Sequence, residues 1–516
     1  MNTGFKALCD DPFKLKEIIH NQQHRINQLE ELIRLQKHRQ FGASSEKSSD
    51  QGELFDEAEA LIHTDESDGD TDIQAESVTT QNPAKKSGRK PLPAELPRLR
   101  IEHDLPESDK TCTCGCQLTL IGEECSEQLD IIPAKIQVLV HVRKKYACKQ
   151  CEETIKLSPL PPQPIPKSMA SPRLLAYIAT SKYQDGLPLY RQEVVFNRMD
   201  IDLGRNTKAR WMIKSGEALQ PLWNLLEDQL LSCPYIHGDE TPVQVLKEPD
   251  KTAQSRSYMW VRVSGLPDKK VILFDYAPGR GGNIAQKLFA GYKGYLQTDD
   301  YAGYNAVCVD NGISQLGCLA HARRKFIEAQ KALKTPKGQK TSNGKADVVL
   351  NLMGKLYGIE RTIKDKSIEE RYQIRQRESL PILKKLRSWL DKTLHHVLPK
   401  GLLGKALGYL DKNWNKLNLY TQAGYLNIDN NPAENAIRPF VIGRKNWLFS
   451  DTPKGAKASA MLYSMIETAK ANNLEPFKYL CHVFKMLPAA QNLEEIEALL
   501  PWNVDKLALE NLAASV

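Results

Sequence analysis

Three acidic positions, far apart along the chain, have the residue type and the local setting that phosphodiester chemistry uses. Asp239 follows a short apolar run in "YIHGDETPVQVL", an aspartate of "LQTDDYAGYN" follows a second such run, and Glu434 lies in "DNNPAENAIRP". In-line displacement at phosphorus is accelerated by two divalent ions about 3.5–4 Å apart, which activate the attacking oxygen and neutralise the leaving one. Mg²⁺ prefers oxygen ligands and keeps several waters, so a few carboxylates suffice to hold it. The three positions therefore predict a site for Mg²⁺ or Mn²⁺, provided that the fold brings them together.

The second carboxylate has two candidates, Asp299 and Asp300. They point to opposite faces if the strand continues through them, because side chains alternate along a strand. Alternation alone leaves the choice open, and an Asp-rich stretch before "YAGYN" is also typical of a turn.

Glu434 has an alternative role as part of an ordinary helix start. Asn431 would be the N-cap, Pro432 the first helical position and Glu434 the third. The residues that follow favour a helix facing DNA, because they carry basic and amide groups suited to phosphates. They are Asn435, Arg438, Arg444, Lys445, Asn446 and Trp447.

Three further residues near these positions carry side chains that can contact a metal. Cys318 and His321 in "CLAH" supply only two of the ligands that a metal site needs, so we expect them to pack beside the acidic site. His237 shares a strand face with Asp239 but is not expected to be a ligand.

The elements that must position the acidic residues begin after residue 234. "YIHGDETPVQVL", "SYMWVRVSG" and "KKVILFDYAPGRGG" read as hairpin-like strands, and later strands alternate with helices. This order predicts a multidomain α+β protein with a ribonuclease-H-like mixed sheet. The sheet would span 233–330 and be completed by the Glu434 helix in 426–470. Helical periodicity predicts an α-helical insertion over 331–425 and a C-terminal helical region over 471–516.

The N-terminal part predicts a coiled coil followed by a linker. Ile19, Ile26 and Ile33 repeat every seven residues, which favours self-association of a coiled coil in 1–48 over a helix packed on its own chain. Residues 49–100 are first acidic and then basic, and they are too polar to bury a core. The basic part offers Arg89 and Lys90, with Lys85 and Lys86, either as DNA contacts or as a solvated linker.

A cluster of cysteines predicts a zinc-binding β module over 101–160. Cysteine knuckles on hairpin turns place four thiolates around Zn²⁺, and a small module with little core needs such a staple. The ligands would be four of Cys112, Cys114, Cys116, Cys148 and Cys151. The pattern does not decide which of the first three cysteines bind.

Residues 161–232 have the proportions of a helix-turn-helix. Ser171 and Pro172 mark a helix start. The helix "PLYRQEVVFNRM" is followed by the break "DIDLG" and a second helix. The start of that second helix would contact DNA through Arg205, Asn206, Lys208 and Arg210. Helical hairpins that only pack are the alternative.

Composition supports a soluble protein with a polyanionic partner. The formal net charge is +8, a mild basic excess. No stretch approaches the roughly 18 apolar residues of a membrane span, and the N-terminus lacks the apolar core of a secretory signal. A cytoplasmic, nucleoid-associated location is therefore expected, without a membrane partner.

The order of these motifs resembles the insertion sequence 66 family of bacterial transposases, along nearly the whole chain. The resemblance rests on "FGASSEKS", "GRKPLPAELPR", "KYACKQC", "GLPLYRQE", "GDETPVQVL", "LQTDDYAGYN", "GCLAHARRKF", "DNNPAENAIRPFVIGRKNWLFS", "SMIETAKANNLEPFKYL" and "LLPWN". It implies a DDE catalytic core with Asp239, Asp299 and Glu434 as the triad. The family's second motif reads threonine, aspartate, glycine, which favours Asp299 and leaves Asp300 in place of the glycine. The resemblance also implies small companion proteins from the same element.

Together these features predict a transposase that binds element ends, cuts DNA with water as the nucleophile and joins a 3′-hydroxyl to target DNA. We expect at least a dimer, formed through the coiled coil, and DNA partners at both the ends and the target. A catalytically silent repressor or architectural protein would share the binding features, but it has no physical reason to keep the triad. A metal-dependent nuclease without strand transfer would keep the triad.

Overall fold

The computed structural model describes residues 22, 136–141, 145–147, 155–157, 160–333, 344–507 and 509. Two compact units divide the chain: Ala43–Lys156 forms one, and Met1–Gly42 with Leu157–Val516 forms the other. The short strands β1 (Lys145–Ala147) and β2 (Ile155–Leu157) pair with each other. The predicted coiled coil (apart from Gln22), the linker with Arg89 and Lys90, and all five candidate zinc cysteines lie outside the described residues.

A mixed sheet is the centre of the larger unit, with strand order β5-β4-β3-β6-β7 and β8 added to β3. Strands β3 (Tyr235–Val245), β4 (Arg256–Ser264) and β5 (Ile272–Ala277) pair antiparallel. On the other side, β3 pairs in parallel with β6 (Tyr295–Gln297), which pairs in parallel with β7 (Ser314–Leu316). The short β8 (Phe449–Ser450) runs parallel to the far end of β3.

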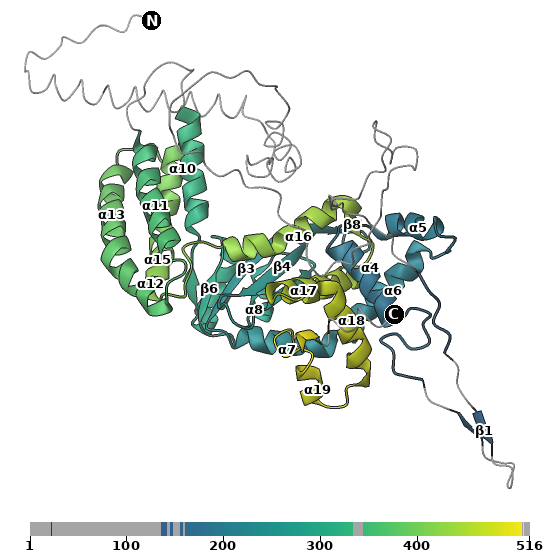
Figure 1. Cartoon of the computed structure of the whole chain (residues 1–516). Coiled ribbons are helices and arrows are strands. Elements are labelled where there is room, and N and C mark those ends of the chain that lie inside the picture. The colour runs from purple at the N-terminus through teal and green to yellow at the C-terminus, as the bar shows by residue number, and fades with distance from the viewer. Residues whose placement is uncertain are drawn as a thin grey trace, which may run out of the picture. The chain divides into compact units, whose positions relative to one another are not determined.

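Helices cover both faces of this sheet (Figure 1). On one face, α16 (Asn431–Trp447) packs on β3 and β4, and α17 (Pro453–Ala471) packs on β5. Side chains of the opposite face meet α7 (Gln220–Leu231), the end of α8 (Gly282–Leu288) and the 3-10 turn η2 (Ala302–Tyr304). Arg262 of β4 shows this second layer, because it donates hydrogen bonds to Glu227 in α7 and to the carbonyl of Leu288. Successive residues of β3 therefore point to opposite faces of the sheet, toward two different layers of helices.

A helical bundle contains a second hydrophobic core beside β7. It comprises α10 (Leu319–Leu333), α11 (Lys345–Thr362), α12 (Ile368–Ile374), the π-helical turn η3 (Arg375–Ser379), α13 (Leu380–Leu394), α14 (Leu402–Lys412), α15 (Trp414–Asn418) and η4 (Leu419–Gln422). Leucines of these helices pack with Tyr235 and Leu316 of the sheet. The described residues of 331–425 are thus mainly helical, which agrees with their periodicity. The backbone N–H of Leu319 donates to the carbonyl of Ile428 at 3.2 Å, so the chain leaves the sheet and returns at the same place.

Three of the remaining helices, α4 (Pro172–Tyr183), α6 (Arg205–Ala218) and α18 (Pro476–Met486), pack on α17. α4 begins at Ser171, whose hydroxyl accepts from the N–H of Leu174, and this confirms the predicted helix start. α5 (Leu189–Asn197) lies between α4 and α6 in the chain. The other helical elements described within residues 160–505 are the 3-10 turn η5 (Leu487–Ala489) and the short α9 (Asn305–Asn311) and α19 (Leu493–Glu497). None of them is both long and apolar enough to cross a membrane.

The contact between α6 and α17 depends on a missing side chain at Gly216. A Cβ at this position would lie 3.1 Å from Cα and 3.3 Å from Cβ of Ala458. These separations are tighter than ordinary van der Waals contact, so the helices approach closely only because Gly216 has no side chain.

Gly216→Ala is therefore expected to destabilise the larger unit by about 1–3 kcal/mol, because the added methyl overpacks the contact. The matched control is Gly354→Ala in α11, where nothing lies within 4 Å of an added Cβ. There alanine's better helix propensity should give a gain of up to about 1 kcal/mol. Urea unfolding followed by far-ultraviolet circular dichroism would measure both, and an equal shift of the two variants would contradict the close contact.

Candidate functional site

The parallel pairing of β3 with β6 brings two aspartates side by side. Tyr235 pairs with Tyr295 and His237 with Gln297. Asp299 follows Gln297 by two residues, as Asp239 follows His237, and paired residues of parallel strands share a face. The charge of Asp299 also raises the pKa of Asp239, so Asp299 is the aspartate of this pair that lies near Asp239.

Asp300 lies elsewhere and has its own partner. Its carboxylate accepts from the Lys412 ammonium at 3.0 Å, which ties it to the end of α14. Asp299 thus lies near Asp239, whereas Asp300 is held by a lysine.

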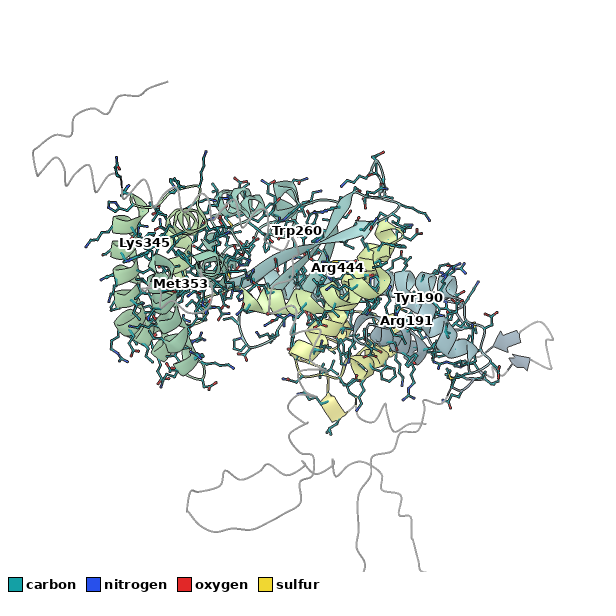
Figure 2. All side chains as sticks on the ribbon, turned by 90° about the horizontal axis from the view of Figure 1, so that it is seen from above. Tyr190, Arg191, Trp260, Lys345, Met353 and Arg444 are labelled. Carbon is teal, nitrogen blue, oxygen red and sulfur yellow. The ribbon has the colours of Figure 1, made fainter. Side chains whose placement is uncertain are left out.

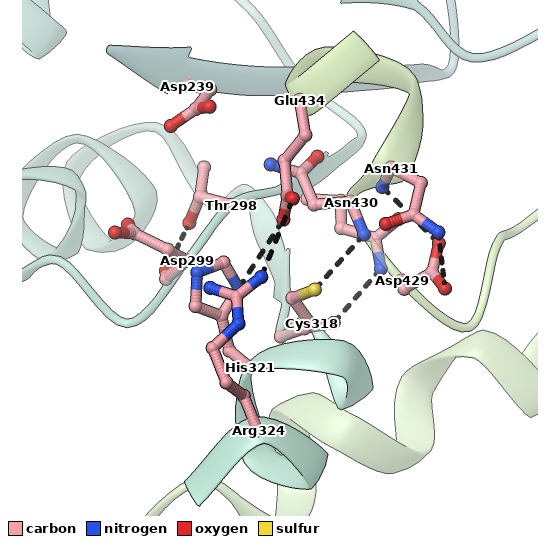
Figure 3. A network of polar contacts seen from close by, with 12 residues as sticks. Asp239, Thr298, Asp299, Cys318, His321, Arg324, Asp429, Asn430, Asn431 and Glu434 are labelled. Carbon is pink, nitrogen blue, oxygen red and sulfur yellow. Dashed lines mark hydrogen bonds and ion pairs between the residues drawn. The ribbon is translucent and has the colours of Figure 1, made fainter. Parts of the chain in front are cut away.

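Glu434 reaches the same edge from the first turn of α16, as Figure 3 shows. The sequence prediction for this helix start was wrong by one residue, because Asn430 and not Asn431 occupies the N-cap. The Asn430 side chain makes no cap. Its Nδ2 donates to the Gly238 carbonyl at 2.9 Å, and its Oδ1 lies 3.0 Å from Nδ1 of His237. The amide therefore joins α16 to β3 next to Asp239.

Repulsion between the gathered carboxylates is visible at Asp239. Burial is the largest cause that raises the pKa of Asp239 well above its usual value of 3.8, and the charges of Glu240, Asp299 and Glu434 add to it. The backbone N–H of Glu240, at 2.9 Å, is the hydrogen bond that opposes this shift. An uncompensated cluster of this kind favours either a proton or a cation.

Glu240 itself points to the opposite face of the sheet and is locked there. It accepts from Nε of Arg280 at 2.6 Å and from the hydroxyl of Tyr304. The Arg280 guanidinium also lies 3.7 Å from Asp299 and stacks on Tyr301, with 3.6 Å to the ring centroid. Sequence reasoning missed Arg280 and Tyr304. Their only signal was their position in Gly-rich turns at the strand ends.

His237 is buried and held by amides. Nδ1 faces Asn430, and Nε2 lies 3.2 Å from Nδ2 of Asn427. Burial lowers the pKa of His237 to about 3, so the imidazole is neutral. Both ring nitrogens thus have amide partners, and the absence of a ligand role for His237 stays a prediction.

Cys318 and His321 lie closer to Glu434 than their spacing alone indicated. Nδ1 of His321 is 3.7 Å from Oε1 of Glu434, and Arg324 is 3.9 Å from Oε2. Sγ of Cys318 accepts from the backbone N–H of Asn430 at 3.3 Å. Both residues thus lie beside the acidic site, as predicted.

The predicted DNA contacts of α6 need one correction. Arg205, Asn206 and Arg210 are exposed, and α6 begins at Arg205 as expected. Lys208 is fully buried, donates to the carbonyl of Leu203, and lies 5.5 Å from the ring centroid of Phe196. Its inclusion was wrong because the ammonium serves the turn between α5 and α6.

The predicted residues of α16 point in different directions. Arg438 and Lys445 are exposed. Arg444 instead donates to the Thr241 hydroxyl at 3.0 Å and to the Pro242 carbonyl, and Figure 2 shows it against the sheet.

Tyr190 and Arg191 of α5 lie to one side of the sheet residue Trp260 in Figure 2, and Lys345 and Met353 of α11 lie to the other.

Comparison with known proteins identifies the family. Residues 167–458 match the model described as transposase IS66 family, and 464–502 match the IS66 C-terminal element. Residues 109–152 match the zinc-finger binding domain of transposase IS66, and 28–101 match a model described as transposase C of IS166 homeodomain. The chain belongs to the IS66 transposase family, and its zinc-finger match indicates a structural zinc.

Similar proteins come from Sinorhizobium fredii. Uncharacterized protein y4qI is 30% identical over 96% of this chain and 92% of its own length. Uncharacterized protein y4jD is 31% identical over 80% of this chain and 81% of its own length. Uncharacterized protein y4hP is 32% identical over 81% and 77%, respectively.

Asp239→Asn is expected to stabilise the protein at pH 7 in the absence of Mg²⁺ and Mn²⁺, by about 1–3 kcal/mol, because it removes a poorly compensated buried charge. A raised carboxyl pKa means that the folded state binds the proton more tightly than the unfolded state. Wild-type stability therefore falls as the pH rises above 3.8 through the raised pKa, and the gain of the variant should vanish near pH 4.

Thermal unfolding at several pH values would measure this difference. Asp300→Asn is the matched control, because Asp300 already has a lysine partner. An equal gain in both variants would contradict repulsion within the cluster.

Proposed function

We propose that this chain is an active transposase that cuts element ends and joins them to target DNA. The observation that carries this proposal is the convergence of Asp239, Asp299 and Glu434 from two parallel strands and a helix. Asp239, Asp299 and Glu434 are the proposed catalytic residues. Membership of the IS66 transposase family supports the same role.

We propose further that the core has a ribonuclease-H-like fold. Three antiparallel strands continue into two parallel ones, in the order β5-β4-β3-β6-β7. In this arrangement the first strand is central, and its end lies beside the end of the next parallel strand. A carboxylate on each can then share one ion.

The donors present fit a divalent cation of the Mg²⁺ or Mn²⁺ kind. All three residues offer carboxylate oxygens, the ligands that these ions prefer. Oε1 of Glu434 is buried and lacks a hydrogen-bond partner among the described residues, and burial together with neighbouring carboxylates raises the pKa of Asp239. Bound cations would activate the attacking oxygen and stabilise the leaving one.

The chain's own residues prepare this site. Arg280 pairs with Glu240 and lies close to Asp299, which limits how far these two carboxylates move. Asn430 fixes the start of α16 against β3. The proposed first step uses water, whose oxygen bonds to phosphorus while the 3′-oxygen leaves and takes up a proton. In the second step that 3′-hydroxyl attacks a target phosphate and displaces the target's own 3′-oxygen, so no covalent protein intermediate forms.

Binding of DNA is assigned to several basic regions. We propose Arg205, Asn206 and Arg210 of α6, together with Arg438 and Lys445 of α16, as contacts. Their exposure supports this. Arg444 is proposed to act indirectly, by holding α16 on β3. Arg89 and Lys90 remain proposals from the sequence, as do the helix-turn-helix role of α5 and α6 and the zinc ligands among Cys112, Cys114, Cys116, Cys148 and Cys151.

A working complex of at least two protomers is also proposed, so that two ends are handled together. The heptad pattern near the N-terminus supports pairing. Companion proteins of the same element and association with the nucleoid complete the proposal.

Cleavage and joining of a labelled element-end duplex with Mg²⁺ tests the catalytic assignment. Asp239→Ala, Asp299→Ala and Glu434→Ala should each reduce both steps by several orders of magnitude, while binding of the duplex persists. Asp300→Ala is the matched control and should retain activity, because Asp300 pairs with Lys412. If wild type binds the duplex but does not cut it even with Mn²⁺ or companion proteins, the protein is a catalytically silent DNA-binding protein and the proposal is rejected. If wild type cuts the duplex but does not join it to target DNA, the protein is a nuclease without strand transfer.

Binding measured at several salt concentrations tests the assignment of α6. Arg205→Gln and Arg210→Gln should each reduce the slope of log K against log salt by about 1, because each removes one phosphate contact. Lys384→Gln on α13 removes the same charge from the helical bundle, which lies far from α6 in Figure 1, and should leave the slope unchanged. If all three variants changed the slope equally, the loss of net charge alone would explain the result. A specific contact between α6 and DNA would then be rejected.

A further inference from the structure

A second set of metal-ligand side chains overlaps the acidic cluster. One ligand atom from each of Cys318, His321 and Glu434 lies within 4.8 Å of the others. Cys318 immediately precedes α10, His321 lies in its first turn, and Glu434 lies in the first turn of α16. The sequence showed only the Cys-x-x-His pair, because the third member lies more than a hundred residues later.

Two of the three ligand atoms lack other partners. Nδ1 of His321 and Oε1 of Glu434 are both buried, and neither has a hydrogen-bond partner among the described residues. They lie 3.7 Å apart, too far for a hydrogen bond. Zinc–ligand bonds of about 2.0–2.3 Å place the ligands of a tetrahedral site about 3.5 Å apart. The separation of these two atoms is therefore already close to that of zinc ligands.

The chemistry of the set differs from that of the three carboxylates. A thiolate, an imidazole and one carboxylate select a thiophilic ion, whereas Mg²⁺ prefers oxygen alone. Surrounding contacts would orient the ligands: the Asn430 N–H donates to Sγ of Cys318, and Arg324 lies near the other oxygen of Glu434. Binding would replace the proton of the Cys318 thiol, which is released to solvent.

We propose that Cys318, His321 and Glu434 bind one thiophilic divalent cation of the Zn²⁺ class, and that this ion withdraws Glu434 from the acidic cluster. Three protein ligands leave the fourth tetrahedral position to water. Inhibition of DNA cleavage follows from the shared glutamate, and this second half rests on the proposed function.

Binding is tested without DNA, in the full chain with its zinc finger loaded. Co²⁺ is the probe, because cobalt bound to a thiolate absorbs visible and near-ultraviolet light. Wild type should bind one more ion than Cys318→Ser or His321→Asn, or bind it at least tenfold more tightly. Cys308→Ser removes another buried cysteine and should behave like wild type. Equal titrations of all four proteins overturn the site, and two independent ligand variants guard against loss of folding in one.

Inhibition is tested by adding Zn²⁺ to the cleavage reaction at fixed Mg²⁺, with each rate compared with that of the same protein without added Zn²⁺. The fold reduction in cleavage rate caused by Zn²⁺ should be at least ten times larger for wild type and Cys308→Ser than for Cys318→Ser. Added Mg²⁺ should reverse this inhibition. Equal inhibition of every protein rejects the withdrawal of Glu434. If no protein cleaves even without added zinc, the proposed function fails while the cobalt titration still decides the site.

Discussion

The parallel pairing of β3 with β6 is the contact on which the acidic site depends. Only a parallel neighbour ends at the same edge of the sheet as β3, and its register determines which of two adjacent aspartates meets Asp239. A slip of one residue would exchange Asp299 for Asp300 and turn the whole pairing to the other face. The buried hydrogen bond between Tyr235 and Gln297, on the same face, helps to fix that register.

Bringing like charges together has a cost in stability that the surrounding polar groups limit. The charge of Glu240 adds to that of the cluster, but the Arg280 guanidinium pairs with this carboxylate and the Tyr304 hydroxyl donates to it. His237 stays neutral between Asn427 and Asn430, so it neither repels a cation nor pairs with Asp239. The carboxylates around Asp239 keep a concentrated negative charge that lowers stability. Such a cost is typical of sites where stability is exchanged for function.

Sequence reasoning predicted the mixed sheet and the start of α4, because both depend on local patterns. Alternation identified β3, and the Ser171–Pro172 pair identified the start of α4. Features set by distant contacts could not be found in this way. The N-cap was assigned to Asn431 because a local rule cannot know that β3 engages the Asn430 side chain. Lys208 was assigned to DNA because helix periodicity alone does not show that Leu203 and Phe196 enclose its ammonium.

Both ends of α16 are fastened to the same strand. Asn430 holds its start at Gly238, while Arg444 and β8 hold its far end near Thr241 and Val245. The helical bundle leaves the sheet at Leu319 and returns at Ile428, where the two backbones are hydrogen-bonded. The position of Glu434 is thus set by β3 and does not depend on the number of residues in the bundle. A bundle of another length could therefore join the sheet at the same two residues without changing the geometry of the carboxylates.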